Sequence, residues 1–311
     1  MKIKKIWAAS FSPTGGTERI VSLLAEELGE QLRIPVEKIA YTLPAEREKI
    51  YSFAGDDLLI LGAPVYAGRI PNKILPDVDR SFEGKRTPAV AVSVFGNRNY
   101  DDALMELSLL LEKHGFHVAA AAAAVSRHAF SDKVGTGRPD AEDMQEFRAF
   151  AEKVAEKIRT LSTVDALQDD AGDSAPDEGE RKQNVSPERS PAACGVPALQ
   201  ITGHNPVGPY YTPLRADGQP AKFLKARPLT DKERCIGCGV CAQVCPMGSI
   251  SPEDTSVVSG VCIKCQACIR ACPVQAKYFT DEDFLSHVKM LEENYTRRAE
   301  NAFFLSVLSG V

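Results

Sequence analysis

The first half of the chain alternates short, almost wholly apolar runs with longer segments in which apolar residues recur every three or four positions. In segment 16–32 such residues form one stripe, which favours a helix packed against a sheet; they are Ile20, Leu23, Leu24 and Leu28. The same reading predicts strands at 3–9, 36–40, 57–62, 89–95 and 118–125, and further helices at 101–114 and 139–161. Near-continuous apolar strands with intervening helices predict a doubly wound α/β fold with a parallel five-stranded sheet.

Ligands of such sheets bind at the carboxyl ends of the strands, so the loops that leave the strands are the places to search for chemistry. Loop 11–17, Phe-Ser-Pro-Thr-Gly-Gly-Thr, joins the first strand to the first helix. Its hydroxyls and unhindered amides at a helix amino terminus suit a phosphate. It lacks the lysine of a nucleoside-triphosphate loop and is not a Gly-x-Gly-x-x-Gly turn. A turn that only caps the helix is the alternative.

Two further loops, 62–71 and 95–102, leave the third and fourth strands. Together with loop 11–17 they resemble the three flavin-binding loops of the flavodoxin family, in which the first loop holds the phosphate of FMN and the others flank the isoalloxazine ring. The resemblance implies phosphate contacts from Ser12, Thr14, Gly15, Gly16 and Thr17. It implies that Pro64, Val65, Tyr66, Ala67, Gly68 and Arg69 line one side of the ring, and Gly96, Asn97, Arg98, Tyr100 and Asp101 the other.

The residue types in these loops agree with a flavin site. Tyr66 and Tyr100 offer flat faces for stacking, and arginines can offset negative charge on a reduced ring. Ordinary loop packing is the alternative for the two tyrosines, and a solvated surface position is the alternative for Arg69 and Arg98. Gly16 stands where flavodoxins often have asparagine, so a backbone contact is expected to replace a side-chain contact with phosphate. His128 follows the fifth strand and is the candidate for passing a proton, with a structural loop histidine as the alternative.

Residues 235–273 hold two cysteine runs, each with spacings of two, two and three residues and a proline directly after the fourth cysteine. This is the iron-sulfur run of bacterial-type ferredoxins, and two runs predict two 4Fe-4S clusters. In such ferredoxins the fourth cysteine of each run ligates the other cluster. The predicted ligand sets are therefore Cys235, Cys238, Cys241 and Cys272 for one cluster, and Cys262, Cys265, Cys268 and Cys245 for the other. Zinc is the alternative, although one tetrahedral ion does not need four such closely spaced cysteines.

The charge pattern and the first residues indicate the cellular setting. Segment 165–191 carries eight acidic and three basic residues, which equals the whole net charge of −5. The balanced remainder offers no basic surface for nucleic acid and no polybasic membrane patch. The amino terminus has only a four-residue apolar stretch, too short for a signal peptide, and no apolar run approaches the roughly 20 residues of a membrane span. We therefore expect a cytoplasmic protein of a reducing, oxygen-poor cell, without membrane insertion.

The acidic segment is rich in proline and glycine and poor in large apolar residues, which predicts a flexible linker. Cys194, close to its end, receives no role. In the helix after the clusters, an apolar stripe is expected to dock the ferredoxin part. The predicted units are a flavodoxin-like FMN-binding domain at 1–162, the acidic linker at 163–202, an extended connecting strap at 203–230, a two-cluster 4Fe-4S ferredoxin domain at 231–280, and a docking helix with its tail at 281–311.

The chain as a whole resembles flavodoxin-ferredoxin fusions of anaerobic microbes, over residues 1–162 and about 203–300. The resemblance implies an electron-transfer protein that couples one-electron 4Fe-4S clusters to a one- or two-electron FMN within one chain. The alternative is an iron-sulfur flavoenzyme, an oxidoreductase in which the clusters feed FMN and the flavin reduces a small organic substrate. A third interpretation is a metal-stabilised interaction protein. The expected partner is a redox protein or a small-molecule acceptor, while the donor, the direction of electron flow and the oligomeric state stay open.

Overall fold

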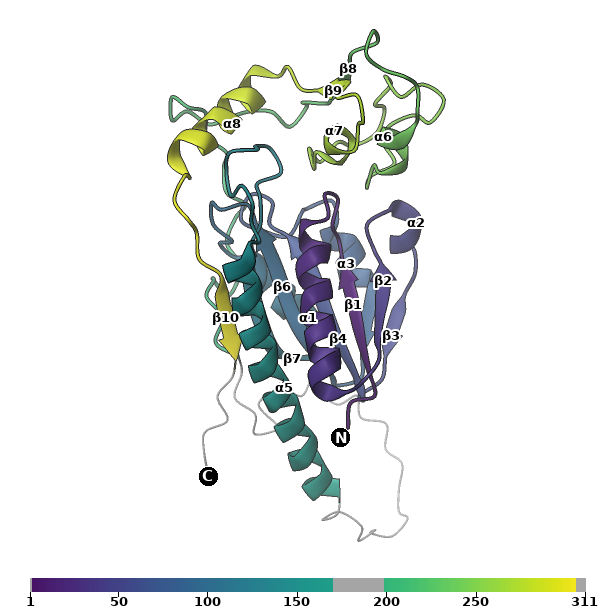
Figure 1. The fold of residues 1–311 in the computed structure, drawn as a ribbon, viewed down its shortest axis with the longest axis vertical. Helices are drawn as coiled ribbons and strands as arrows, with labels where there is room; N and C mark the ends of the chain where they lie inside the picture. Colours follow the sequence, from purple (N-terminus) through teal and green to yellow (C-terminus); the bar gives the residue numbers. More distant parts are fainter. Residues whose placement is uncertain (1, 170–198, 306–311) are drawn as a thin grey trace, which may run out of the picture.

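A computed structural model of the chain describes residues 2–169 and 199–305. Most of the predicted acidic linker, and Cys194 with it, lies outside the described residues. Figure 1 shows a larger body built on a sheet, with a smaller body stacked on one end of that sheet. No helix in the described ranges is long and apolar enough to cross a membrane.

A six-stranded sheet forms the centre of the larger body, with the order β10-β7-β6-β4-β1-β2. The five parallel strands are β1 (Lys5–Ser10), β2 (Val36–Ala40), β4 (Asp57–Pro64), β6 (Thr87–Phe95) and β7 (Phe116–Val125). Numbered along the chain, these strands lie in the order 2-1-3-4-5, which is the order of flavodoxin-like sheets. The predicted doubly wound parallel five-stranded sheet is therefore confirmed.

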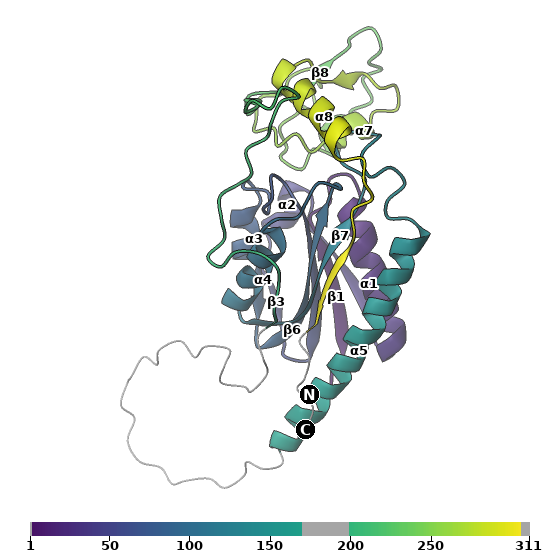
Figure 2. The same cartoon turned by 90° about the vertical axis from the view of Figure 1, so that its left-hand side faces the viewer.

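Helices cover both faces of the sheet (Figure 2). One face is covered by α1 (Gly16–Leu32) and α5 (Ala141–Asp169), and the other by α3 (Leu75–Ser81) and α4 (Ala103–Lys113). Because neighbouring strand residues point to opposite faces, Leu58 and Ile60 pack toward α1 and α5 while Leu59 and Leu61 pack toward α3 and α4. Near the sheet lie α2 (Pro44–Arg47) and the parallel pair of β3 (Tyr51–Phe53) and β5 (Phe82–Gly84). Helix α5 continues past the expected domain boundary at residue 162.

The sixth strand comes from the far end of the chain. Strand β10 (Ala302–Leu305) pairs antiparallel with β7, placing Ala302 opposite Ala123. Phe303 lies beside α5, with its ring 4.8 Å from the ring of Phe150. The sequence pattern predicts a helix and a tail in this region, and β10 lies within the predicted tail.

The smaller body contains little regular structure. Its elements are the antiparallel pair of β8 (Leu229–Thr230) and β9 (Lys277–Tyr278), the short helices α6 (Val240–Gln243) and α7 (Ala267–Arg270), and α8 (Glu282–Asn294). The N-cap residue of α8 is Asp281, whose side chain accepts a hydrogen bond from the amide of Phe284. After α8 the chain returns to the larger body as β10, so the smaller body is attached at both of its ends (Figure 1).

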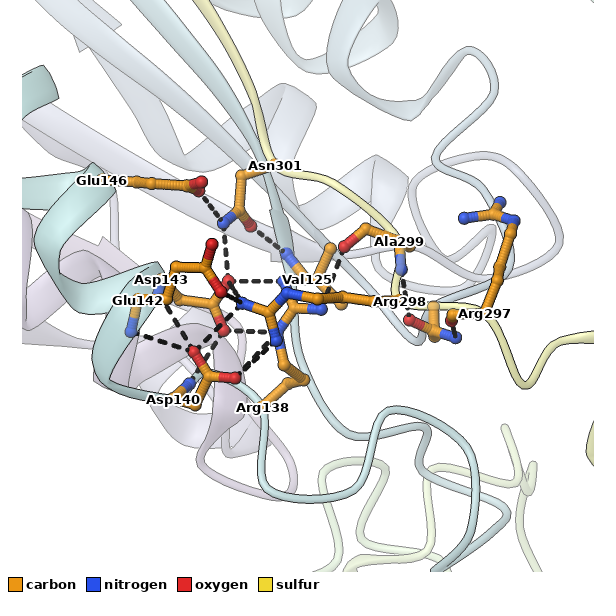
Figure 3. Close-up of polar contacts among 11 residues, drawn as sticks. Val125, Arg138, Asp140, Glu142, Asp143, Glu146, Arg297, Arg298, Ala299 and Asn301 are labelled. Carbon is orange, nitrogen blue, oxygen red and sulfur yellow. Dashed lines mark hydrogen bonds and ion pairs between the residues drawn. The ribbon is translucent and has the colours of Figure 1, made fainter.

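Polar contacts fasten the returning segment to the larger body (Figure 3). Arg138 forms an ion pair with Asp143 and donates to the carbonyl of Ala299, 2.9 Å away. The side chain of Asn301 donates to Asp143 at 2.8 Å and accepts from the amide of Val125 at 2.8 Å. Arg138 and Asp143 are both buried, so these contacts compensate charges that would otherwise be costly to bury.

Candidate functional site

Two hollows in the smaller body are lined by the cysteine runs. The outer hollow is lined by Cys235, Cys238, Cys241 and Cys272. The inner hollow is lined by Cys245, Cys262, Cys265 and Cys268. Each hollow takes three cysteines from one run and one from the other, which is the grouping that the spacing of the runs predicts.

The inner hollow is more deeply buried than the outer one. Burial raises the pKa of the Cys265 thiol and of the Cys268 thiol to about 12. Cys238, by contrast, is exposed. Iron binds thiolates, so assembly of a cluster in the inner hollow must release protons from thiols that are neutral at pH 7.

A cleft of about 220 Å³ lies at the carboxyl ends of the parallel strands. It is lined by residues of all three loops that the sequence analysis assigned to FMN. These are Ser12, Thr14, Gly16, Thr17, Pro64, Val65, Tyr66, Ala67, Gly68, Gly96 and Arg98. The cleft therefore occupies the position in which sheets of this topology bind their ligands.

The first loop ends at the amino terminus of α1, a helix of 17 residues. The hydroxyl of Ser12 accepts a hydrogen bond from the amide of Glu18 at 3.0 Å, which fixes the loop against the helix. Among the described residues, the amides of Gly16 and Thr17 have no acceptor. A Cβ atom on Gly16 would lie 2.7 Å from the hydroxyl of Ser126, so the glycine lets that hydroxyl approach the loop. Free amides, hydroxyls and a helix dipole together suit a dianion.

Two predicted ring contacts hold other segments of the chain and do not line the cleft. Arg69 forms an ion pair with Glu106, and its guanidinium lies 4.8 Å from the ring of Tyr210. Asn97 is buried and donates to the carbonyls of Tyr295 and Arg297, at 2.8 and 2.7 Å. These side chains thus fasten the strap and the returning segment.

Three more predicted residues lie outside the cleft lining. Gly15 has φ 83° and supplies the left-handed residue before α1. Tyr100 packs against Phe95, with ring centroids 5.5 Å apart. Asp101 forms an ion pair with Arg98, which does line the cleft.

The roof of the cleft consists of residues that the sequence analysis did not assign to it. They come from the strap, the second cysteine run and α8, and are Tyr211, Pro213, Phe223, Ile263, Lys264, His287 and Leu291. The amide of Tyr211 donates to the carbonyl of Ala67 at 2.8 Å, which lays the strap along the edge of the cleft. A histidine within the apolar stripe of α8 was the one signal in the sequence that could have pointed to this roof.

The inner hollow and the cleft share a wall. Ile263 and Lys264, which lie between Cys262 and Cys265, line both spaces. Tyr66 lies on the cleft side of this wall. Burial raises the pKa of Tyr66 well above its usual value, and the neighbouring Cys265 and Cys262 raise it further. A group bound in the inner hollow would therefore lie close to a group bound in the cleft.

His128 lines the cleft next to Gly96. Its Nδ1 accepts a hydrogen bond from the amide of Phe130 at 3.1 Å. Burial lowers the pKa of His128 to about 3, and the nearby His287, Arg98 and Arg270 contribute to the shift. The ring is thus neutral at pH 7 and holds its single proton on Nε2. In this state it is a hydrogen-bond donor and not a source of an acidic proton.

The two cysteine runs match known protein families. Residues 228–251 and residues 259–275 each match a family described as a 4Fe-4S binding domain. These matches, together with the two cysteine-lined hollows, show that the smaller body binds 4Fe-4S clusters. Together with the flavodoxin-like sheet, these clusters support an electron-transfer role, because such clusters carry single electrons.

Among curated proteins the search returns no match. Among solved structures the larger body is similar to a flavodoxin from the domain Archaea (13% identity, TM-score 0.33, 50% of this chain and 99% of that one). It is similar to oxidised flavodoxin 2 from Bacillus cereus (17% identity, TM-score 0.37, 50% of this chain and 99% of that one). It is also similar to rubredoxin oxygen:oxidoreductase from the anaerobe Desulfovibrio gigas (16% identity, TM-score 0.35, 51% of this chain and 37% of that one). The fold class itself rests on the strand order described above.

Proposed function

We propose that the chain is an intramolecular electron-transfer protein that couples two 4Fe-4S clusters to one FMN. The observation that carries this proposal is the shared wall: Ile263 and Lys264 line both the inner hollow and the cleft. When bound, the clusters carry single electrons and FMN carries one or two. The chain holds the two binding spaces next to each other without needing an encounter between molecules.

FMN fits the groups that line the cleft. The phosphate would lie against the amides of Gly16 and Thr17, with the hydroxyl of Thr14 beside it. Ser126, which the small Gly16 admits, would supply the side-chain contact that flavodoxins often take from asparagine. The ring would lie between the loop of Tyr66 and the loop of Gly96. These amides, hydroxyls and loop residues are the chemical groups by which loops that resemble those of flavodoxins would bind FMN.

The attachment at both ends supports a fixed arrangement of the two bodies. The strap is fastened by Tyr210, whose hydroxyl donates to the carbonyl of Ile70 at 2.8 Å. Arg47 of α2 donates to the carbonyl of Pro246 at 2.7 Å, directly after Cys245. Such contacts keep the inner hollow against the cleft.

External exchange of electrons is assigned to the outer hollow, where Cys238 is exposed. The partner would be a redox protein or a small-molecule acceptor. A reducing compartment such as the cytoplasm suits eight cysteine thiolates committed to iron.

Rapid mixing of anaerobically purified protein with a one-electron donor tests the relay. Bleaching of the clusters and reduction of the flavin are followed at separate wavelengths. We expect a rate of internal transfer that does not change with protein concentration, as a contact within one chain requires. A rate that rises in proportion to protein concentration would place the contact between chains and overturn the proposal.

The cofactors are tested separately from the relay. Purified protein should hold about eight iron atoms and about eight sulfides per chain, and heat should release FMN. The double variant Thr14→Ala, Thr17→Ala should bind FMN about a hundredfold more weakly or worse, because two hydrogen bonds to a charged group are lost and each contributes about 1.5–3 kcal/mol. The control Thr160→Ala on α5 should leave FMN affinity unchanged. Release of FAD alone, or unchanged affinity in the double variant, would contradict the assignment.

A further inference from the structure

Two histidines in the cleft have no part in the proposed relay. His128 lies in the loop after β7 and His287 lies on α8, and both line the cleft. The two rings also pack around a common aromatic side chain, Phe130. Its ring centroid lies 5.1 Å from that of His128 and 6.3 Å from that of His287. The pair therefore forms one small part of the cleft.

The hydrogen bonds of the two rings fix opposite tautomers. Nδ1 of His128 accepts from the amide of Phe130, so the proton of this neutral ring is on Nε2. Nδ1 of His287 lies 2.7 Å from the carbonyl oxygen of Leu214, which can only accept, so Nδ1 carries the proton there. Nε2 of His287 is then a bare lone pair. The pair presents one N–H donor and one acceptor.

Neither Nε2 atom has a hydrogen-bond partner among the described residues. His287 is only 5% exposed and lines the cleft, and its Nε2 is not among the fully buried unpaired side-chain atoms of the described residues. A polar atom that faces the cleft without a protein partner is free to bind a ligand of matching chemistry. The two Nε2 atoms therefore match a ligand that accepts a hydrogen bond from the ring of His128 and donates a hydrogen bond to the ring of His287.

The surroundings select a flat and uncharged ligand. Phe223 lies nearly parallel to the ring of His287, with centroids 5.4 Å apart and an interplanar angle of 30°. The guanidinium of Arg98 is already paired with Asp101 and lies 4.1 Å from the ring of Tyr211, and that of Arg270 is paired with Asp132. Lys264 donates to the carbonyl of Leu224 at 2.5 Å. Aromatic walls and compensated cations favour a ring compound over a phosphate or a polycarboxylate.

We propose that His128 and His287 form a binding site for a small quinone or hydroquinone ring beside FMN. The inference rests on the FMN site of the proposed function and gives that site a substrate class. One oxygen of the ligand accepts from Nε2–H of His128, and a hydroxyl on the other side donates to Nε2 of His287. A hydroquinone satisfies both atoms, whereas a quinone, which has no hydroxyl, satisfies only His128.

The site consequently binds the reduced compound more tightly than the oxidised one, which favours reduction of a bound quinone. Two electrons that enter through the clusters and two protons from water convert the two carbonyls of a quinone to the two hydroxyls of a hydroquinone. The neutral histidines orient the ring and hold its oxygens, and neither of them has to supply a proton.

Calorimetric titration of the oxidised, FMN-loaded protein with hydroquinone and with 1,4-dimethoxybenzene tests the site without turnover. The dimethoxy compound can accept from His128 but cannot donate to His287. We expect hydroquinone to bind about tenfold more tightly, the factor that corresponds to one hydrogen bond. His287→Phe should remove this difference, and His128→Phe should weaken both ligands, while His128→Gln, which keeps an N–H donor, should restore part of the affinity.

The control His114→Gln lies after α4 at the opposite end of the sheet and should leave both affinities unchanged. Iron and FMN contents of every variant show whether it is correctly folded, and the two ligands compared on one variant cancel any general loss of stability. Equal affinities for the two ligands in the unmodified protein, or no saturable binding while FMN is present, overturn the inference alone. Protein without FMN overturns the proposed function and this inference together.

Discussion

The two cysteine runs have the same spacing but differ at the positions where the backbone is left-handed. The run at 235–245, whose first three cysteines line the outer hollow, is the outer run. Its left-handed positions are glycines, Gly237 with φ 68° and Gly239 with φ 74°. The run at 262–272, whose first three cysteines line the inner hollow, is the inner run. Its left-handed positions are Lys264 with φ 58° and Gln266 with φ 69°. A side chain in this conformation costs about 1–2 kcal/mol. The inner run thus carries backbone strain that the outer run avoids, and strain of this kind concentrates at functional positions.

The two runs differ in their surroundings, and the run with the strained backbone is the one that packs against the larger body. Ile236 of the outer run is 65% exposed, while its counterpart Ile263 packs against the core of the larger body. Lys264 is only 9% exposed and reaches both the inner hollow and the cleft. One run faces solvent and the other forms a wall of the cleft, so the repeated motif performs two different tasks.

Removing one ligand from each hollow gives the largest test of this difference. Cys265→Ala should lose the inner cluster and with it the transfer of electrons to the flavin, while FMN stays bound. Cys238→Ala should lose the outer cluster but still allow small reductants to reach the inner one. Iron content, cluster spectra and rapid mixing check both variants. Flavin reduction that survives in Cys265→Ala and disappears in Cys238→Ala would reverse the assigned order of the clusters.

A second test concerns the fastening of the inner run. Arg270 of α7 donates to the carbonyls of His128 and Ala129, at 3.2 and 2.8 Å. Its counterpart in the outer run, Gln243, is exposed. Arg270→Gln should weaken docking by about 1.5–3 kcal/mol, the usual contribution of hydrogen bonds from a charged group, and slow internal transfer several-fold. Gln243→Ala is the matched control. Equal rates in the two variants would show that the runs are fastened alike.

The regular elements of the larger body were predictable because their signals are local. The helix over 16–32 and the strand over 36–40 have the predicted bounds, since apolar periodicity and a helix amino terminus are properties of neighbouring residues. The grouping of cysteines was predictable for the same reason, because chemistry fixes the spacing of the runs.

The parts of the structure that were missed depend on residues far apart in sequence. Asn97 lies in a loop whose composition resembles a flavin-binding loop. Its hydrogen-bond partners, Tyr295 and Arg297, lie about 200 positions away in the sequence. Strand β10 is four residues long and needs the alanine-rich edge of β7 as its partner. The roof of the cleft likewise forms only when the strap and α8 meet. Apart from the apolar stripe of α8 and its histidine, no local pattern in the chain points to these encounters.

The charge of Lys264 gives the third test. Replacing it by Gln should lower the midpoint potential of the inner cluster by on the order of 50 mV, because a nearby positive charge stabilises the added electron. Redox titration followed by electron paramagnetic resonance measures this shift. The control Lys232→Gln removes an exposed lysine near the outer run and should leave both potentials unchanged. A shift in the outer cluster alone would contradict the placement of Lys264 beside the inner one.

The smallest effect isolates the backbone. A Cβ on Gly237 would meet no atom within 4 Å, so Gly237→Ala should lower the free energy of unfolding by about 1–2 kcal/mol through its left-handed φ alone. At the inner run the substitutions Lys264→Gly and Lys264→Ala both remove the charge and differ only in the methyl group. The glycine variant should be the more stable by about 1 kcal/mol, with the same cluster potential as the alanine variant. Thermal unfolding of cluster-loaded protein measures both differences. If glycine gives no advantage at position 264, then the inner run carries no strain there, and the contrast between the two runs lies in their side chains alone.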